Sequence, residues 1–300
     1  MNIIESLLDA DPSVKRMTQK YLLDMNPDFV EDGWISRFLG FFDSETGTWG
    51  GGIYGPKWIS TFYTLRDLAS LEIRPDHPIY QIGLDTLIKH MWSDKWHEDD
   101  VCVVAMLVSL LTYGQSDSKI VDDMISYLIG TQLKDGGWNC AITYKPSDKS
   151  SINTTLSVLE AYRDYEQFGY TTHLKTVLEQ TIPGQDYLLK RHLMYRLTND
   201  ELVISYIKDF HFPTRWKYDV LRALCYFASV NYEKVPELSE GLSLLKNKFK
   251  KGYLHKGPTY TGKHHFKMET GKIGTMNTLR GLMVLRTFEP DEYYRIINME

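Results

Sequence analysis

The chain has 300 residues, of which 43% are hydrophobic and 24% are charged, so it has enough apolar side chains for a large core. Its 34 basic and 39 acidic residues give a net charge of −5, which excludes the overall positive field typical of nucleic-acid-binding proteins. We therefore expect no nucleic-acid partner. Length is a soft guide to domain number, and we predict a single domain over residues 1–300.

The N-terminal segment carries acidic residues early and has no basic start followed by a long apolar run, so we predict no signal peptide. No uncharged apolar stretch of the sequence reaches the length that spans a membrane. The three cysteines are an odd number and do not suggest a disulfide framework, which fits a reducing compartment. Together these features predict a cytoplasmic protein without a transmembrane segment.

Two kinds of helix are predicted along the chain. After helices at 13–25 and 30–40, amphipathic helices are expected at 77–92, 120–129 and 236–249, where apolar residues recur at helical spacing on one side. The other kind is apolar nearly all round and must be buried. It is predicted at 99–112, 152–165, 217–230 and 274–287, with a further member near residue 57.

The spacing of the buried helices indicates a repeat. They start near Lys57, Asp99, Ser151, Lys217 and Gly274, and subtraction of these residue numbers gives intervals of 42, 52, 66 and 57 residues. Each interval fits one helical hairpin. Hairpins of this period either close into an inner ring of helices surrounded by an outer ring, or stack as an open solenoid. We expect the all-α ring, an (α/α) toroid, completed by the helices within residues 1–42.

A turn motif supports the repeat. Residues 132–138 read Gln-Leu-Lys-Asp-Gly-Gly-Trp, residues 43–50 repeat the order of acid, glycine and tryptophan, and residues 250–253 are a weaker copy with Tyr253 in place of tryptophan. Glycine permits the left-handed backbone that ends a helix, and a glutamine amide can bond the open backbone groups there. The motif predicts that the Trp138 ring is buried.

Polar residues gather where the predicted inner helices begin. If the ring closes, these positions converge on one mouth of a central cavity, where buried polar groups would need a partner or a ligand. Helix capping is the alternative for Asn153, Thr154 and Asn277. The polar positions are Lys57, Trp58, residues 97–100, Asn153, Thr154, residues 215–219, Asn277 and Arg280.

The Gln-x-x-Asp-Gly-Gly-Trp turn and the inner-helix spacing resemble the α/α-toroid superfamily, which contains squalene and terpene cyclases and protein prenyltransferase β subunits. Residues 51–61 and 276–280 look like those of single-domain bacterial proteins called prenyltransferase-like or squalene-cyclase-like. The resemblance covers most of the chain. It implies the toroid fold more firmly than it implies an activity.

Class II cyclases carry Asp-x-Asp-Asp at the start of an inner helix, and the middle aspartate protonates an alkene or epoxide. Aligned on this pattern, Asp99 falls on the proton donor, Asp100 on its neighbour, and His97 replaces the first acid. A histidine at that position either tunes the acidity of Asp99 or disables it. The alternative is that Asp99 or Asp100 only caps the helix.

Protein prenyltransferases bind zinc through Asp-x-Cys and a histidine that opens the next inner helix. Asp100 and Cys102 match the first two ligands, but Asn153 stands where the histidine is expected and is a poor zinc ligand. We therefore predict no metal and no other cofactor. The alternative ligand set is Asp100, Cys102 and Cys140, with His97 as another substitute; otherwise Cys102 is a small buried residue.

Aromatic and basic residues complete the candidate ligand site. Rings near the mouth can hold an isoprenoid and stabilise a carbocation, although rings in a helical core serve equally well for packing. His264 and His265 precede the last inner helix, where paired histidines are more often surface residues. The candidate ligand-binding residues are Tyr54, Lys57, Trp58, Asn153, Trp216, Asp219, His265 and Arg280.

The leading hypothesis is a toroid that binds a hydrophobic, isoprenoid-like small molecule, with protonation-initiated cyclase chemistry at Asp99. The alternative is a toroid without catalytic activity that binds a peptide or protein, and a zinc-dependent transferase ranks third. The sequence has no Asp-Asp-x-x-Asp motif for diphosphate ionisation, because valines and a cysteine follow Asp100. This disfavours class I terpene chemistry.

Overall fold

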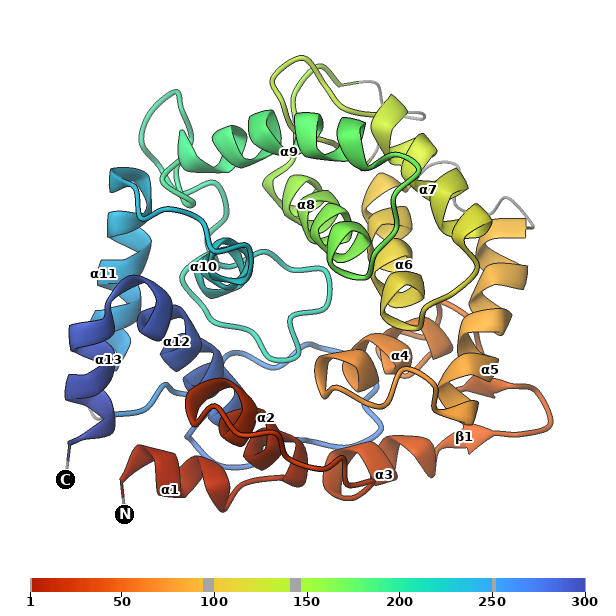
Figure 1. The fold of residues 1–300 in the computed structure, drawn as a ribbon, viewed down its shortest axis with the longest axis horizontal. Coiled ribbons are helices and arrows are strands. Elements are labelled where there is room, and N and C mark those ends of the chain that lie inside the picture. The colour runs from red at the N-terminus through yellow and green to blue at the C-terminus, as the bar shows by residue number, and fades with distance from the viewer. Residues whose placement is uncertain (1, 94–99, 141–146, 250–251, 300) are drawn as a thin grey trace. The chain divides into compact units, whose positions relative to one another are not determined.

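The computed structural model describes residues 2–93, 100–140, 147–249 and 252–299 (Figure 1). The described residues are mostly helical, and their strands are limited to one short antiparallel pair, β1 (Phe42–Asp43) and β2 (Thr48–Trp49). The all-α prediction is therefore confirmed, whereas the closed ring of helices stays a prediction. Within the described ranges, no helix has both the length and the apolar character required to cross a bilayer.

The chain divides into two compact units, which are described separately. The terminal unit comprises Met1–Phe41, Ser70–Ile73 and Arg191–Glu300, and the middle unit comprises Phe42–Ala69 and Arg74–Lys190. This division does not test the prediction that residues 1–300 form a single domain.

The terminal unit joins the two ends of the chain. α12 packs against both α10 and α2, and α13 contacts α12 and α1. The Arg286 side chain donates a hydrogen bond of 2.6 Å to the carbonyl of Tyr21 and pairs with Asp24. The helices of this unit are α1 (Ile3–Leu8), α2 (Pro12–Leu22), α3 (Gly33–Leu39), α10 (Val220–Ser229), η2 (Pro236–Leu238), α11 (Ser239–Lys248), α12 (Thr275–Phe288) and α13 (Pro290–Ile297).

The middle unit is built around two buried helices. α6 packs against α7 and α8, and α8 packs against α9, as Figure 1 shows in yellow and green. α6 buries residues on every side, whereas α7 buries one stripe. The helices are α4 (Thr61–Ser70, whose last residue belongs to the terminal unit), α5 (Pro78–Leu87), the π-helical η1 (Ile88–Ser93), α6 (Val101–Tyr113), α7 (Ser118–Gly130), α8 (Ile152–Gln167) and α9 (Leu174–Leu189).

The helices predicted from periodicity are present, with shifted ends. The four predicted inner helices correspond to α6, α8, α10 and α12. α10 begins at Val220 rather than near Lys217, because Asp219 is its N-cap. The helix expected near Lys57 begins at Thr61, because residues 50–60 form a loop. α9 was not predicted, and it contains an internal Pro183-Gly184 pair, which is more typical of a helix end.

The turn motif anchors each tryptophan in the same way. Trp138 and Trp49 are both completely buried. The Trp138 backbone N–H donates to Thr155 Oγ1 at 3.0 Å, and the Trp49 N–H donates to Thr61 Oγ1 at 3.1 Å. In the turn at 132–138, the Gln132 amide donates to the Gly136 carbonyl at 2.9 Å. The prediction that Trp138 is buried is confirmed.

The third copy of the turn differs from the prediction by one residue. Leu254, not Tyr253, donates its backbone N–H to the threonine of the next helix, Thr278, at 2.9 Å. Leu254 is 1% exposed, whereas Tyr253 is half-buried and lines a pocket. The motif therefore marks the turn correctly, but an aliphatic side chain replaces the indole at its buried position.

Candidate functional site

The predicted site residues fall into both units, and two of them, His97 and Asp99, lie outside the described residues. The middle unit contains one set and the terminal unit another, and each is treated by itself. The first set consists of Tyr54, Lys57, Trp58, Asp100, Cys102, Cys140 and Asn153, and the second consists of Trp216, Asp219, His265 and Arg280.

In the middle unit, aromatic rings cluster at the loop before α4. The Tyr54 and Tyr63 ring centroids are 5.3 Å apart, and the Trp58 ring meets Tyr63 edge-on at 4.8 Å. Lys57 Nζ lies 5.4 Å from the centroid of the Tyr54 ring, so a cation faces this aromatic group. Trp58 and Tyr63 are buried, and Tyr54 is half-buried.

Asp100 occupies the N-cap position of α6, but its side chain makes no capping hydrogen bond. By contrast, Asp117 caps α7 by accepting from the Lys119 N–H at 2.8 Å. Burial, followed by the negative charge of Asp100, raises the pKa of Tyr54. The Tyr63 side chain lowers that pKa by more than the Asp100 charge raises it, and the charge of Arg66 lowers it by less. The Asp100 carboxylate therefore acts on the aromatic cluster instead of closing the helix end.

Cys102 and Cys140 form a disulfide, which contradicts the expectation from the odd cysteine count. Their Cα atoms are 5.4 Å apart, within the range that a disulfide bridges. The buried turn at Trp138 brings Cys140 to the first turn of α6, where its sulfur lies 3.4 Å from Asp100 Oδ1. Cys225, in α10, takes no part in this disulfide.

The alternative metal ligands Asp100, Cys102 and Cys140 do come together, but the two sulfurs are bonded to each other and cannot serve as thiolate ligands. Within the described ranges, no group of three or more His, Cys, Asp or Glu side chains is arranged to hold a metal ion. Asn153 is the second residue of α8 and Ser151 is the N-cap, so Asn153 does not take the capping position.

A titration of free thiol groups tests whether the Cys102–Cys140 disulfide forms. Chain purified without reductant and then denatured should titrate with one thiol, that of Cys225, and full reduction should raise the count to three. Cys225→Ser should lower the first count to zero and leave the reduced count at two. Three thiols in the unreduced wild type would show that the bond does not form in solution.

In the terminal unit, His211 and Asp219 form a buried pair. The exposed fractions of their side chains are 1% and 0%. His211 Nδ1 lies 3.3 Å from Asp219 Oδ2, and the same oxygen accepts from the His211 backbone N–H at 2.9 Å. Asp219 Oδ1 accepts from the Arg222 N–H at 2.8 Å and so caps α10. A carboxylate only accepts hydrogen bonds, so the imidazole proton belongs on Nδ1 and Nε2 is left as an acceptor.

Two tyrosine rings and a lysine surround this pair. The centroid of the His211 ring is 5.6 Å from that of Tyr206 and 5.7 Å from that of Tyr260. Lys217 Nζ lies 4.7 Å and 4.8 Å from the same two centroids. Burial, followed by the charge of Asp219, raises the pKa of Tyr206. We call His211, Asp219, Tyr206, Tyr260 and Lys217 the His211 cluster.

The other predicted residues of the terminal unit have mainly structural contacts. Arg280 Nη1 donates to the carbonyl of His211 at 3.3 Å, so Arg280 supports the loop that carries the cluster. The Asn277 amide donates to the Phe210 carbonyl at 2.8 Å and does not cap α12, whose N-cap is Gly274. His265 stacks on Phe41 with a centroid distance of 4.7 Å. Trp216 is half-buried.

His211 was missed from the sequence. The predicted polar region before this helix was residues 215–219, and His211 lies four residues earlier, beyond a phenylalanine and a proline. The sequence feature that could have pointed to His211 is a histidine that precedes Asp219 by one loop, immediately before an apolar helix. A loop conformation decides whether two such residues meet, and helical periodicity does not report it.

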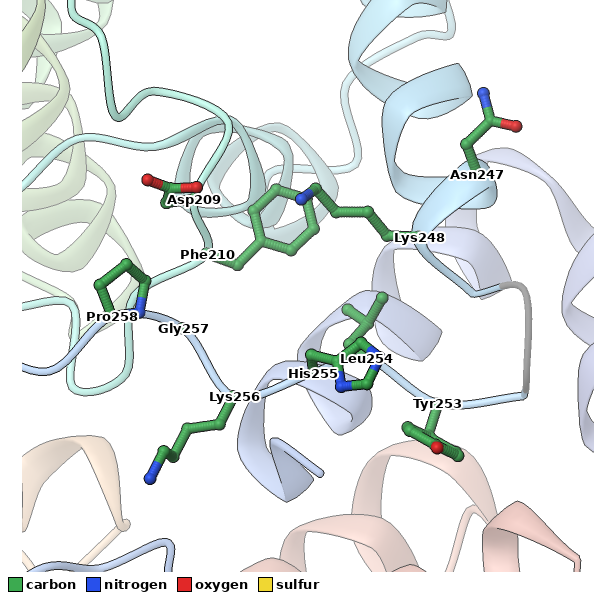
Figure 2. Close-up of a pocket in the computed structure, with 10 residues that line it drawn as sticks. All are labelled: Asp209, Phe210, Asn247, Lys248, Tyr253, Leu254, His255, Lys256, Gly257 and Pro258. Atoms are coloured by element: carbon green, nitrogen blue, oxygen red, sulfur yellow. The ribbon is translucent and has the colours of Figure 1, made fainter. Parts of the chain in front are cut away.

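An open pocket of the terminal unit is lined by residues that lie close in sequence to His211 and Tyr260. Its volume is about 420 Å³. Figure 2 shows Lys248 beside Phe210, and Lys248 Nζ lies 5.0 Å from the centroid of that ring. Lys256 donates to the Glu269 carbonyl at 3.0 Å. The lining residues are Asp209, Phe210, Asn247, Lys248, Tyr253, Leu254, His255, Lys256, Gly257 and Pro258.

Comparison of the sequence with models of protein families and with curated proteins gives no match. The functional argument therefore depends on the residues themselves.

Proposed function

We propose that the protein binds a hydrophobic, isoprenoid-like molecule against the aromatic cluster of the middle unit and cyclises it by protonation, with Asp100 and its neighbour Asp99 supplying the acid. The observation that carries the proposal is the Asp100 side chain, which leaves the helix cap unused and acts electrostatically on Tyr54. A carboxylate at a helix start ordinarily caps it, so this orientation favours a role outside the helix.

The surrounding rings suit the chemistry. Proton transfer from a carboxylic acid to an alkene carbon leaves a carbocation, which ring closure moves along the chain and loss of a proton finally quenches. The reaction is an isomerisation, so it needs no second substrate. Aromatic faces such as those of Tyr54 and Trp58 stabilise a nearby cation through their quadrupoles. Lys57 above Tyr54 provides a counter-charge for an anionic head group, if the isoprenoid carries one.

The proposal is tested by offering squalene, geranylgeraniol and geranylgeranyl diphosphate to the purified chain and following both binding and cyclic products. Tyr54→Leu and Trp58→Leu should each weaken binding about five- to tenfold. Asp100→Asn and Asp99→Asn should keep binding and lower turnover at least about 100-fold.

Matched controls separate the site from general damage. Tyr113→Leu removes a half-buried ring that packs on Tyr80 elsewhere in the middle unit, and Asp117→Asn changes the N-cap of α7. Both controls should leave binding and turnover unchanged. Failure of the wild type to bind any of the three compounds would refute the proposal. Binding without any product would refute the cyclase chemistry and leave a binding protein.

A further inference from the structure

The imidazole of His211 has a buried acceptor atom, Nε2, that accepts no hydrogen bond from the described residues. Its Nε2 atom is buried and has no hydrogen-bond partner among the described residues. An unsatisfied buried polar atom costs about 1–3 kcal/mol, so native proteins rarely leave one without a water or a ligand. The ring cannot turn over to relieve this cost without giving up the contact between Nδ1 and Asp219.

The partner that fits Nε2 is a donor, because Nδ1 carries the imidazole proton. The imidazole that carries Nε2 contacts the rings of Tyr206 and Tyr260, and Lys217 contacts the same two rings, so an O–H group that donates to Nε2 would lie near them. The ammonium of Lys217 can balance a negative charge on that oxygen, and the carboxylate of Asp219 can balance a positive charge on the imidazole. The cluster is therefore arranged to pull a proton from a bound hydroxyl.

Space for a small molecule adjoins the two segments that carry His211 and Tyr260. Asp209 and Phe210 line the pocket immediately before His211, and Gly257 and Pro258 line it shortly before Tyr260 (Figure 2). A Cβ at Gly257 would collide with the Phe210 carbonyl, so the two segments pack backbone against backbone. A ligand in this pocket lies next to the backbone of the cluster.

We propose that the His211 cluster is a general-base site for a ligand with a weakly acidic hydroxyl group, such as a phenol or an enol. In the bound state the ligand's O–H bond breaks, its electron pair stays on oxygen, and the proton moves to His211 Nε2. The resulting imidazolium is held by Asp219, and the oxyanion faces Lys217. Tyr206 and Tyr260 provide the flat apolar walls that suit a planar ligand.

The test uses 4-nitrophenol as the probe, because its phenolate absorbs visible light and its phenol does not. Titration of the wild type should show saturable binding with the apparent pKa of the bound probe lowered by about one unit or more. His211→Gln, which keeps a polar side chain but no base, should abolish the shift. Lys217→Met keeps the base and should reduce the shift, since the oxyanion loses its counter-charge.

The matched control is His192→Gln, which changes a partly exposed histidine of the same unit and should behave like the wild type. Circular dichroism and melting curves of each variant show whether it is folded, and Lys217→Met provides a second readout if His211→Gln does not fold. An unshifted probe, or a shift that survives in folded His211→Gln, would overturn the proposal. Because squalene and geranylgeraniol binding is measured at the other unit, this result is independent of the cyclase test.

Discussion

Replacing Trp138 with alanine is expected to lower the free energy of unfolding by about 3–5 kcal/mol. The indole is completely buried, and its Nε1–H donates to the Leu128 carbonyl at 3.0 Å. The ring also presses on α9, where a Cβ at Gly184 would lie 2.9 Å from Trp138 Cζ3. Alanine would leave a cavity and remove one of the hydrogen bonds to the Leu128 carbonyl, which keeps those from Thr131. Denaturant unfolding followed by circular dichroism measures the loss.

A second tryptophan of the same unit, Trp92, serves as the control for the substitution of Trp138. Trp92 is half-buried in η1, so Trp92→Ala should cost clearly less than Trp138→Ala. A loss below about 1 kcal/mol for Trp138→Ala would mean that the turn does not depend on its indole, since a fully buried aromatic ring contributes more than that.

Asp219→Ala should lower stability by about 2–5 kcal/mol, combining the loss of a helix cap with an unsatisfied buried N–H group. Asp219 accepts from the backbone N–H groups of both Arg222 and His211, and its side chain is fully buried. Chemical denaturation at fixed pH measures the change in the terminal unit.

The comparison is Asp117→Ala, which removes the exposed N-cap of α7 and should cost about 1 kcal/mol. Equal losses for the two variants would show that Asp219 is only a cap and that its contact with the His211 loop adds nothing. Asp219→Asn is the informative intermediate, because an amide oxygen can still cap α10 but the charge beside His211 is gone.

Helical periodicity predicted much of the fold because burial follows a 3.6-residue repeat. The stripe at 120–129 and the apolar run at 101–111 correspond directly to α7 and α6. α9 was not predicted, and the observed helix contains Pro183, a residue that is unfavourable inside a helix. Local propensity is a weak guide where tertiary packing holds a helix together, as Trp138 does against Gly184.

The candidate sites were less predictable. The sequence singled out Asp100 and Asp219 by their position before apolar helices, but that position is shared by a capping aspartate and a functional one. Only side-chain direction separates them: Asp219 caps α10, and Asp100 does not cap α6. The Cys102–Cys140 bond depends on a turn 38 residues away in sequence, a separation that residue spacing alone does not resolve.

The hydrogen bonds from Arg286 and Tyr293 to the end of α2 have a consequence for biosynthesis. Residues 1–41 emerge from the ribosome long before their partners in α12 and α13, which lie more than 230 residues later in the chain. At about 5–20 residues per second, α2 waits on the order of ten seconds or more before α12 can cover the side that packs against it. Meanwhile every segment of the middle unit has already been made. A nascent chain stalled before residue 275 should therefore contain a protease-resistant middle unit and protease-sensitive N-terminal helices.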